Sequence, residues 1–171
     1  MTRHTLTELN SLTRPEFTRL IGPVFEHSPW IAEVAWAKCP FTSKESIHAA
    51  LCETVRQANE EKQLALICAH PDLVGKLALA GQLTRESTGE QASAGLDRLT
   101  AHEVELFQKN NAAYKAKFGF PFIICARLNK KEAILTGFAK RLHDTRKNEV
   151  KTALEEIFKI ADLRLSDLIS T

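Results

Sequence analysis

The chain has 171 residues, a length at which a polypeptide commonly buries one hydrophobic core. Its hydrophobic share of 44% and charged share of 26% are those of ordinary soluble globular proteins, which excludes collagen-like, disordered and disulfide-scaffold classes. The 23 basic and 21 acidic residues nearly balance, and no window concentrates Lys and Arg, so nucleic acid is not an expected partner. We therefore expect residues 1–171 to form a single globular domain.

Neither a membrane span nor a metal site is expected. The longest apolar run, residues 120–126, contains a proline and falls far short of the ~20 residues that a membrane-spanning helix needs. The first residues lack the hydrophobic stretch of a signal peptide, and the last three are no peroxisomal address, so we expect a cytoplasmic protein. Cys39, Cys52, Cys68 and Cys125 form no Cys-x-x-Cys pair and lie in apolar stretches, which favours buried reduced thiols over disulfides or zinc ligands.

Helix start signals recur along the first half of the chain. Residues 13–16 fit a capping box with proline in the first turn, and apolar residues follow at helical spacing through Phe25. Residues 28–29 open a second, short helix. Residues 42–45 open a third, with Ile47, Ala50, Leu51 and Val55 expected to face inward. A fourth is expected over residues 60–69, where an acidic lead-in and the lack of flanking glycines favour a helix over a buried strand.

The second half continues this helical pattern with one interruption. Residues 87–90 fit a capping box ahead of a helix through Leu96. Thr100 and Glu103 start the next helix, whose inward face is expected to carry Val104, Phe107, Asn111 and Tyr114. Residues 118–125 are aromatic and β-branched, and Pro121 forces its predecessor out of helical geometry, so a buried irregular segment is expected near residues 118–126. Two further helices cover about 129–142 and from 145 to near 169. The sequence therefore predicts an all-α globular fold of about eight helices.

An arginine occupies an inward position of the last predicted helix. Apolar residues recur there with a spacing that predicts one more core position at residue 164, and Arg164 occupies it. Burying a guanidinium costs several kcal/mol unless an anion meets it, so an internal carboxylate or a ligand's carboxylate is expected opposite. Two non-functional interpretations remain open, a side chain that extends to the surface and a structural pair with a glutamate.

His70 ends an apolar helix at the point where Pro71 forbids regular continuation. The carboxyl terminus of a helix favours the charged form of an imidazole, and burial favours the neutral form. The two effects together can set the pKa near neutrality, which suits a proton donor. From these residues alone, a capping histidine beside a turn explains the pattern better than a catalytic role does.

Ser87, Glu90 and Gln91 follow at positions i, i+3 and i+4, so they lie along one helical face. A capping box explains Ser87 and Glu90 without any function, but it does not need Gln91. The first turn of this helix could therefore also hold a small polar ligand.

Taken together, these patterns resemble the 2-oxo-4-hydroxy-4-carboxy-5-ureidoimidazoline (OHCU) decarboxylases of urate breakdown, in order from about Leu9 to Leu168. The resemblance is carried by four strings: Ala69-His70-Pro71-Asp72-Leu73, Ser87-x-x-Glu90-Gln91-x-x-Ala94-Gly95-Leu96, Asn111-x-x-Tyr114-x-x-Lys117-Phe118-Gly119-Phe120-Pro121-Phe122-Ile123, and Ile160-Ala161-x-Leu163-Arg164-Leu165.

The resemblance implies an all-helical homodimer that forms (S)-allantoin and carbon dioxide from an anionic ureidoimidazoline, without metal or organic cofactor. It implies His70, Glu90 and Arg164 as catalytic residues. The substrate-binding residues that it implies are Pro71, Ser87, Glu90, Gln91, Phe122, Ile123, Ile124, Cys125, Ala126 and Arg164.

Two rival functions stay open from the sequence. His70-Pro71-Asp72 resembles the signature of J-domain co-chaperones, so the chain could be a non-catalytic helical interaction module, although Glu60 and Glu61 make the preceding helix acidic rather than basic. A docking loop of this kind should be exposed. A ring hydrolase is the second rival, but no activated serine, metal set or paired base supports it.

Overall fold

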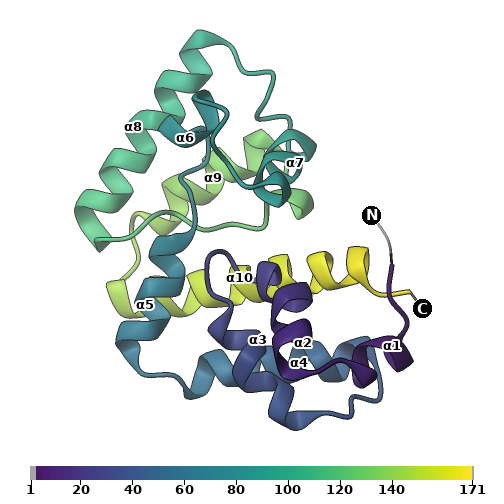
Figure 1. Cartoon of the computed structure of the whole chain (residues 1–171). Coiled ribbons are helices and arrows are strands. Elements are labelled where there is room, and N and C mark those ends of the chain that lie inside the picture. The colour runs from purple at the N-terminus through teal and green to yellow at the C-terminus, as the bar shows by residue number, and fades with distance from the viewer. Residues whose placement is uncertain (1–2, 171) are drawn as a thin grey trace. The chain divides into compact units, whose positions relative to one another are not determined.

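The computed structural model describes residues 3–170, apart from the side chain of Leu77, and this part of the chain is helical (Figure 1). The only strand-like pairing within it is an isolated bridge between His4 and Ile169. The α-helices are α1 (Leu6–Ser11), α2 (Arg14–Ile21), α3 (Trp30–Ala35), α4 (Lys44–Gln57), α5 (Glu60–Ala69), α6 (Lys76–Leu79), α7 (Arg85–Ser93), α8 (Ala101–Phe118), α9 (Lys131–Arg141) and α10 (Arg146–Leu168). Three 3₁₀-helices join them, η1 (Gly22–Val24), η2 (Trp36–Lys38) and η3 (Ala126–Leu128). The predicted all-α class is confirmed.

The described residues divide into two compact units. Unit 1 comprises residues 3–69 and 158–170, and unit 2 comprises residues 70–157. The last helix, α10, contributes residues to both units. No helix of residues 3–170 combines the length and the apolar character that crossing a membrane requires.

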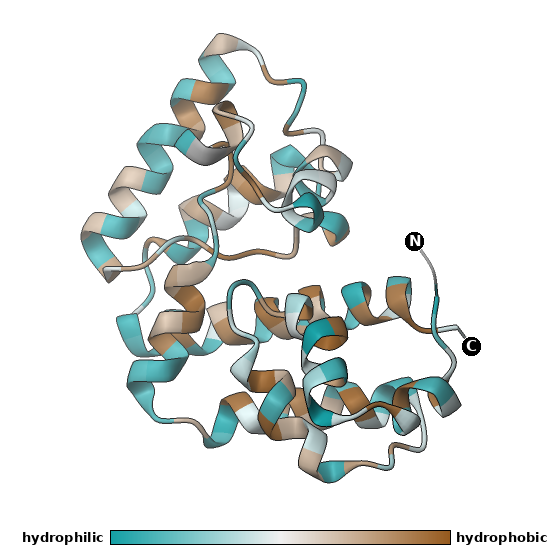
Figure 2. Cartoon of the chain, viewed as in Figure 1, coloured by the Kyte–Doolittle hydropathy of each residue, from teal (hydrophilic) through white to brown (hydrophobic). Residues whose placement is uncertain are grey.

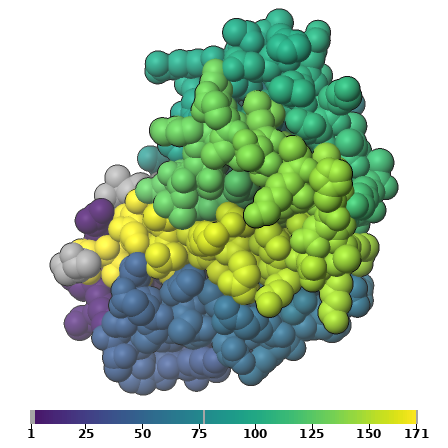
Figure 3. Space-filling model, turned by 180° about the vertical axis from the view of Figure 1, so that it is seen from behind, coloured from purple at the N-terminus to yellow at the C-terminus, as the bar shows by residue number. Residues whose placement is uncertain are grey.

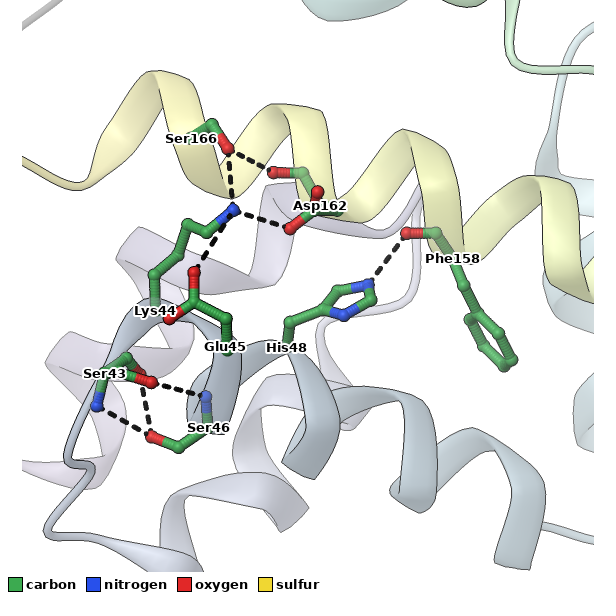
Figure 4. A network of polar contacts seen from close by, with 8 residues as sticks. All are labelled: Ser43, Lys44, Glu45, Ser46, His48, Phe158, Asp162 and Ser166. Atoms are coloured by element: carbon green, nitrogen blue, oxygen red, sulfur yellow. Dashed lines mark hydrogen bonds and ion pairs between the residues drawn. The ribbon is translucent and has the colours of Figure 1, made fainter. Parts of the chain in front are cut away.

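Unit 1 packs α2, α3 and α4 around fully buried apolar side chains such as Phe17, Ile31 and Leu51. The residues of α4 that were predicted to face inward are all buried: Ile47, Ala50, Leu51 and Val55. Polar contacts join α4 to the end of α10: Nζ of Lys44 lies 2.7 Å from Oδ1 of Asp162 (Figure 4). Figure 3 shows α4 (blue) and the end of α10 (yellow) side by side on this face of the molecule.

Unit 2 is built around an aromatic cluster. Tyr114 of α8 packs edge-on against Phe122 with ring centroids 5.2 Å apart, and Phe122 stacks on Phe138 of α9 at 3.9 Å. Hydrophilic and hydrophobic residues are interspersed along α8 (Figure 2), and its buried residues recur three or four positions apart, on one face of the helix: Phe107, Asn111, Tyr114 and Phe118. Residues 119–125 follow α8 as the predicted irregular segment, and apart from Gly119 and Ile124 they are buried. The segment thus supplies aromatic side chains to the core without helical structure.

Several sequence predictions need correction. The N-cap of α7 is Thr84, whose hydroxyl accepts from the N–H of Ser87, so Ser87 lies inside the first turn and does not begin the helix. Thr84, three residues before Ser87, is also a preferred N-cap residue, and the structure uses it in place of Ser87. Helices α1 and α6 were not predicted, although Thr5 and Glu8 form a capping box at α1. Cys68 is exposed, unlike the buried thiol expected.

The capping box of α8 predicts a measurable dependence of stability on pH. Hydrogen bonds from Lys131 and from Thr100 hold the pKa of Glu103 at about 2, below its ordinary value of 4.5. Because this pKa is lower in the folded state, its stabilising contribution is full above about pH 4.5 and is lost as the pH falls towards 2. We expect Glu103→Gln to flatten the pH dependence of the unfolding free energy in that window, measured by urea denaturation. Glu105→Gln, at an exposed position of the same helix, is the control, and equal slopes in both variants would contradict the assignment.

Candidate functional site

His70 begins a loop, residues 70–75, between α5 and α6 of the chain. Its side chain is buried, with 8% of the residue's surface exposed. Pro71 directly after it ends the helical path, as the sequence predicted. The loop therefore carries a buried histidine, and the exposed docking loop of the interaction-module hypothesis is not what the structure shows.

Three side chains of unit 2 hold this loop. Oε1 of Gln91 accepts a hydrogen bond from the N–H of Val74 at 3.1 Å. Asn111 donates from Nδ2 to the carbonyl oxygen of Leu73 at 2.8 Å. Nζ of Lys115 lies 2.6 Å from Oδ2 of Asp72. The loop that follows His70 is thus tied to two helices, α7 through Gln91 and α8 through the other two.

The loop adopts a backbone conformation that few residues tolerate. Val74 has a φ of 54°, in the left-handed region, where a β-branched residue is a true outlier. A Cβ atom at Gly75 would lie 2.6 Å from the Cβ of Asp72, so only glycine fits there without displacing the chain. Such strain persists where surrounding contacts over-determine the backbone, and it is common at functional sites.

Helix α7 presents the predicted polar trio. Ser87 and Gln91 are buried, with 5% and 7% of their surface exposed, and Glu90 is half-buried. The hydrogen bond that Gln91 accepts from the N–H of Val74 places this trio beside the backbone that carries His70. Helix α7 also packs against η3, where the irregular segment ends. Within unit 2, the structure therefore brings together the His70 loop, α7 and the end of the segment 122–126.

The backbone of the irregular segment has side-chain partners that sequence reasoning did not identify. Nη1 of Arg141 donates to the carbonyl oxygen of Ile123 at 2.6 Å, and Oε2 of Glu156 accepts the N–H of Cys125 at 2.8 Å. Asn129 donates from Nδ2 to the carbonyl oxygen of Cys125 at 2.9 Å. A buried segment without regular structure needs such partners, because unsatisfied peptide groups are costly.

Arg141 is itself fixed by a buried network. Its Nε donates to Oε2 of Glu149 at 2.8 Å, and its guanidinium lies 4.3 Å from the ring centroid of Phe122. The hydroxyl of Tyr114 donates to the same carboxylate oxygen of Glu149. Burial, together with this hydrogen bond, raises the pKa of Tyr114. The aromatic core and the backbone of residues 122–123 are therefore held by one charged cluster.

Arg164 belongs to unit 1, where an internal carboxylate meets it. Its Nη1 donates to Oε2 of Glu26 at 3.1 Å and to the carbonyl oxygen of Pro23 at 3.3 Å. Both side chains are buried, with 5% and 2% exposed. The predicted buried arginine is thus confirmed as buried. The sequence did not identify Glu26 as its partner. The local signal is a glutamate that directly follows the apolar residues Val24 and Phe25.

Among the residues that the structure describes, no group of three or more His, Cys, Asp or Glu side chains has an arrangement suited to a metal ion. The four cysteines, all within the described residues, form no disulfide bond.

Comparison with known proteins gives consistent matches over nearly the whole chain. The family model for OHCU decarboxylase matches residues 10–166. The 2-oxo-4-hydroxy-4-carboxy-5-ureidoimidazoline decarboxylase of Halalkalicoccus jeotgali is 42% identical, with 98% of this chain and 93% of the relative covered. The enzyme of the same name from Amia calva is 40% identical, with 96% and 94% covered.

Two crystal structures are also similar. A structure of an (S)-allantoin synthase has a TM-score of 0.79 at 30% identity, covering 98% of this chain and 54% of that chain, so this chain spans about half its length. A structure of an OHCU decarboxylase in the presence of (S)-allantoin has a TM-score of 0.67 at 28% identity, covering 83% and 92%. The fold and these matches define an all-α enzyme of the carboxy-lyase class. The chain belongs to the OHCU decarboxylase family.

Proposed function

We propose that this protein decarboxylates 2-oxo-4-hydroxy-4-carboxy-5-ureidoimidazoline to (S)-allantoin and carbon dioxide, the last step in converting urate to allantoin, without a cofactor. Membership of the OHCU decarboxylase family supports this activity. The structural observation that carries it is the hydrogen bond from Val74 to Gln91, because it places the loop of His70 against the helix of Ser87 and Glu90.

The substrate can accept the electrons of the broken bond. Carbon dioxide leaves when the bond between the ring carbon and the carboxylate breaks. The electron pair of this bond forms a double bond to the neighbouring ring carbon, and the π electrons of that carbon's C=N bond move to the ring nitrogen. That nitrogen takes up a proton. The hydroxyl then gives up its proton as the carbonyl forms, and the neighbouring carbon receives one. The net reaction consumes one proton and needs no oxidant or reductant.

The protein must therefore orient the carboxylate and manage protons on one face of the substrate. We assign proton transfer to His70, and the orientation or polarisation of the imidazole or the substrate hydroxyl to Glu90. Pro71 shapes the loop beside the substrate, and Ser87 and Gln91 hydrogen-bond the ring or the ureido group. Since Gln91 directs Oε1 to Val74, its Nε2 is the atom available as a donor.

Two further groups complete the proposed binding set. Arg164 would bind substrate oxygens and stabilise the developing enolate or ureido oxygen. Binding the carboxylate alone would stabilise the substrate in its ground state and would not lower the barrier to the reaction. Main-chain groups of the irregular segment would supply the remaining hydrogen bonds. They belong to Phe122, Ile123, Ile124, Cys125 and Ala126.

The proposal is tested by circular dichroism of freshly oxidised urate treated with hydroxyisourate hydrolase, with and without this protein. We expect faster appearance of a single allantoin enantiomer when the protein is present. A product that forms at the spontaneous rate, or without optical activity, would refute the proposed function.

We also propose a cytoplasmic homodimer. The lack of a disulfide among the four cysteines fits a reducing compartment, and the family resemblance supports the dimer. Analytical ultracentrifugation tests the dimer, and a species with the mass of one 171-residue chain at micromolar concentration would contradict it.

A further inference from the structure

Helix α8 presents two polar side chains, one turn apart, to consecutive residues of the His70 loop. Asn111 donates to the carbonyl oxygen of Leu73, and Lys115 pairs with the carboxylate of Asp72. Residues at i and i+4 lie on the same face of a helix, so both contacts reach the loop from one side. They join segments 38 and 43 positions apart in the sequence, which means that the fold and not local structure sets the loop's place.

The two contacts differ in weight. Asn111 is buried, with 5% of its surface exposed, and its hydrogen bond to Leu73 is buried as well. The side chain of Lys115 is 47% exposed, so solvent screens its ion pair with Asp72. Losing the Asn111 amide would leave a buried carbonyl oxygen without this donor, and the backbone would have to move to find another. Asn111 is therefore the stronger of the two restraints.

The restraint acts where the backbone is strained. Val74, with a φ of 54°, directly follows Leu73, and Gln91 holds the N–H of Val74. Asn111 and Gln91 thus bind the two polar groups of one peptide unit, the carbonyl oxygen of Leu73 and the N–H of Val74, from different helices. Strained backbone relaxes when one such restraint is removed.

We propose that Asn111 is a positioning residue for the decarboxylation. Its hydrogen bond to Leu73, three residues after His70, fixes the backbone that carries His70. This inference rests on the proposed role of His70. A proton donor must stay within hydrogen-bond reach of the reacting atom, and a displacement of about 1 Å slows transfer up to about 100-fold. A mobile donor also reaches both faces of the planar intermediate, so the handedness of the product depends on the same restraint.

The test compares Asn111→Ala with Asn10→Ala. Asn10 makes the same kind of contact in unit 1, where its Nδ2 donates to the carbonyl oxygen of Phe41 at 2.8 Å. For Asn111→Ala we expect kcat to fall about 10- to 100-fold with KM changed less than about threefold. We also expect a lower enantiomeric excess of (S)-allantoin and faster hydrogen exchange at the amide of Val74. Asn10→Ala should keep the wild-type values of all four quantities.

Each result has a defined meaning. If the wild type is active and Asn111→Ala matches it in kcat and enantiomeric excess, the inference is wrong and the proposed function stands. If the wild type has no decarboxylase activity, the proposed function fails and the inference fails with it. Should Asn111→Ala not fold, Asn111→Ser replaces it, since the shorter hydroxyl cannot span the same distance, and the same results are expected.

Discussion

His70→Ala is expected to lower kcat by about 10²- to 10⁴-fold and to abolish the optical activity of the allantoin formed. The imidazole is the proposed proton carrier, and without it the enolic intermediate is protonated by water from either side. The fold should persist, because Gln91, Asn111 and Lys115 hold the loop through residues 72–74 and not through the imidazole. Rates and enantiomeric excess are measured by circular dichroism on the freshly generated substrate.

His102→Ala is the matched control for this variant. His102 is an exposed histidine in the first turn of α8, so its removal tests the loss of an imidazole away from the proposed site. It should have wild-type kinetics. A His70→Ala protein that still forms fully optically active product at the wild-type rate would remove His70 from the mechanism.

Arg164→Ala is expected to lower the free energy of unfolding by about 3–5 kcal/mol, because the buried carboxylate of Glu26 loses its guanidinium partner. Arg164→Lys should recover part of this stability but not the activity, since a point charge replaces the planar fork that can bind two substrate oxygens. Urea denaturation and steady-state kinetics measure the two effects separately.

A double variant distinguishes the structural role of this pair from its proposed role in substrate binding. Replacing both charges, as Glu26→Leu with Arg164→Met, leaves neither member of the pair buried without the other, so stability should return to within about 2 kcal/mol of the wild type. Activity should remain lost. A stable double variant with wild-type kcat/KM would show that Arg164 serves the fold alone.

Local sequence signals predicted most of the helices, because they depend on residues three or four positions apart. The capping box of Thr100 and Glu103 and the inward face of α4 are formed as expected. The start of α7 was placed three residues late because Thr84 and Ser87 are both competent N-caps, and only the structure shows which one is used. Short α6 has four residues, too few for a periodic pattern to appear.

The partners of the candidate site could not be predicted in the same way. Arg164 was recognised because it interrupts an apolar stripe, but its partner Glu26 lies 138 positions earlier in the chain. Asn111 was expected on the inward face of its helix, yet its contact with Leu73 depends on how a distant loop folds. The spacing of apolar residues in α9 and α10 does not single out Arg141 or Glu156. Such pairs are set by tertiary structure, which a single sequence encodes only indirectly.

The central claim is that the protein removes the carboxyl group of this substrate and protonates one face of the product. It is tested most directly with substrate carrying ¹³C in that carboxyl group, followed by NMR beside the optical activity of the product. We predict that the label leaves as carbon dioxide at a rate proportional to protein concentration while (S)-allantoin accumulates. Label that leaves at the same rate with and without protein, or that stays in the product, would contradict the account.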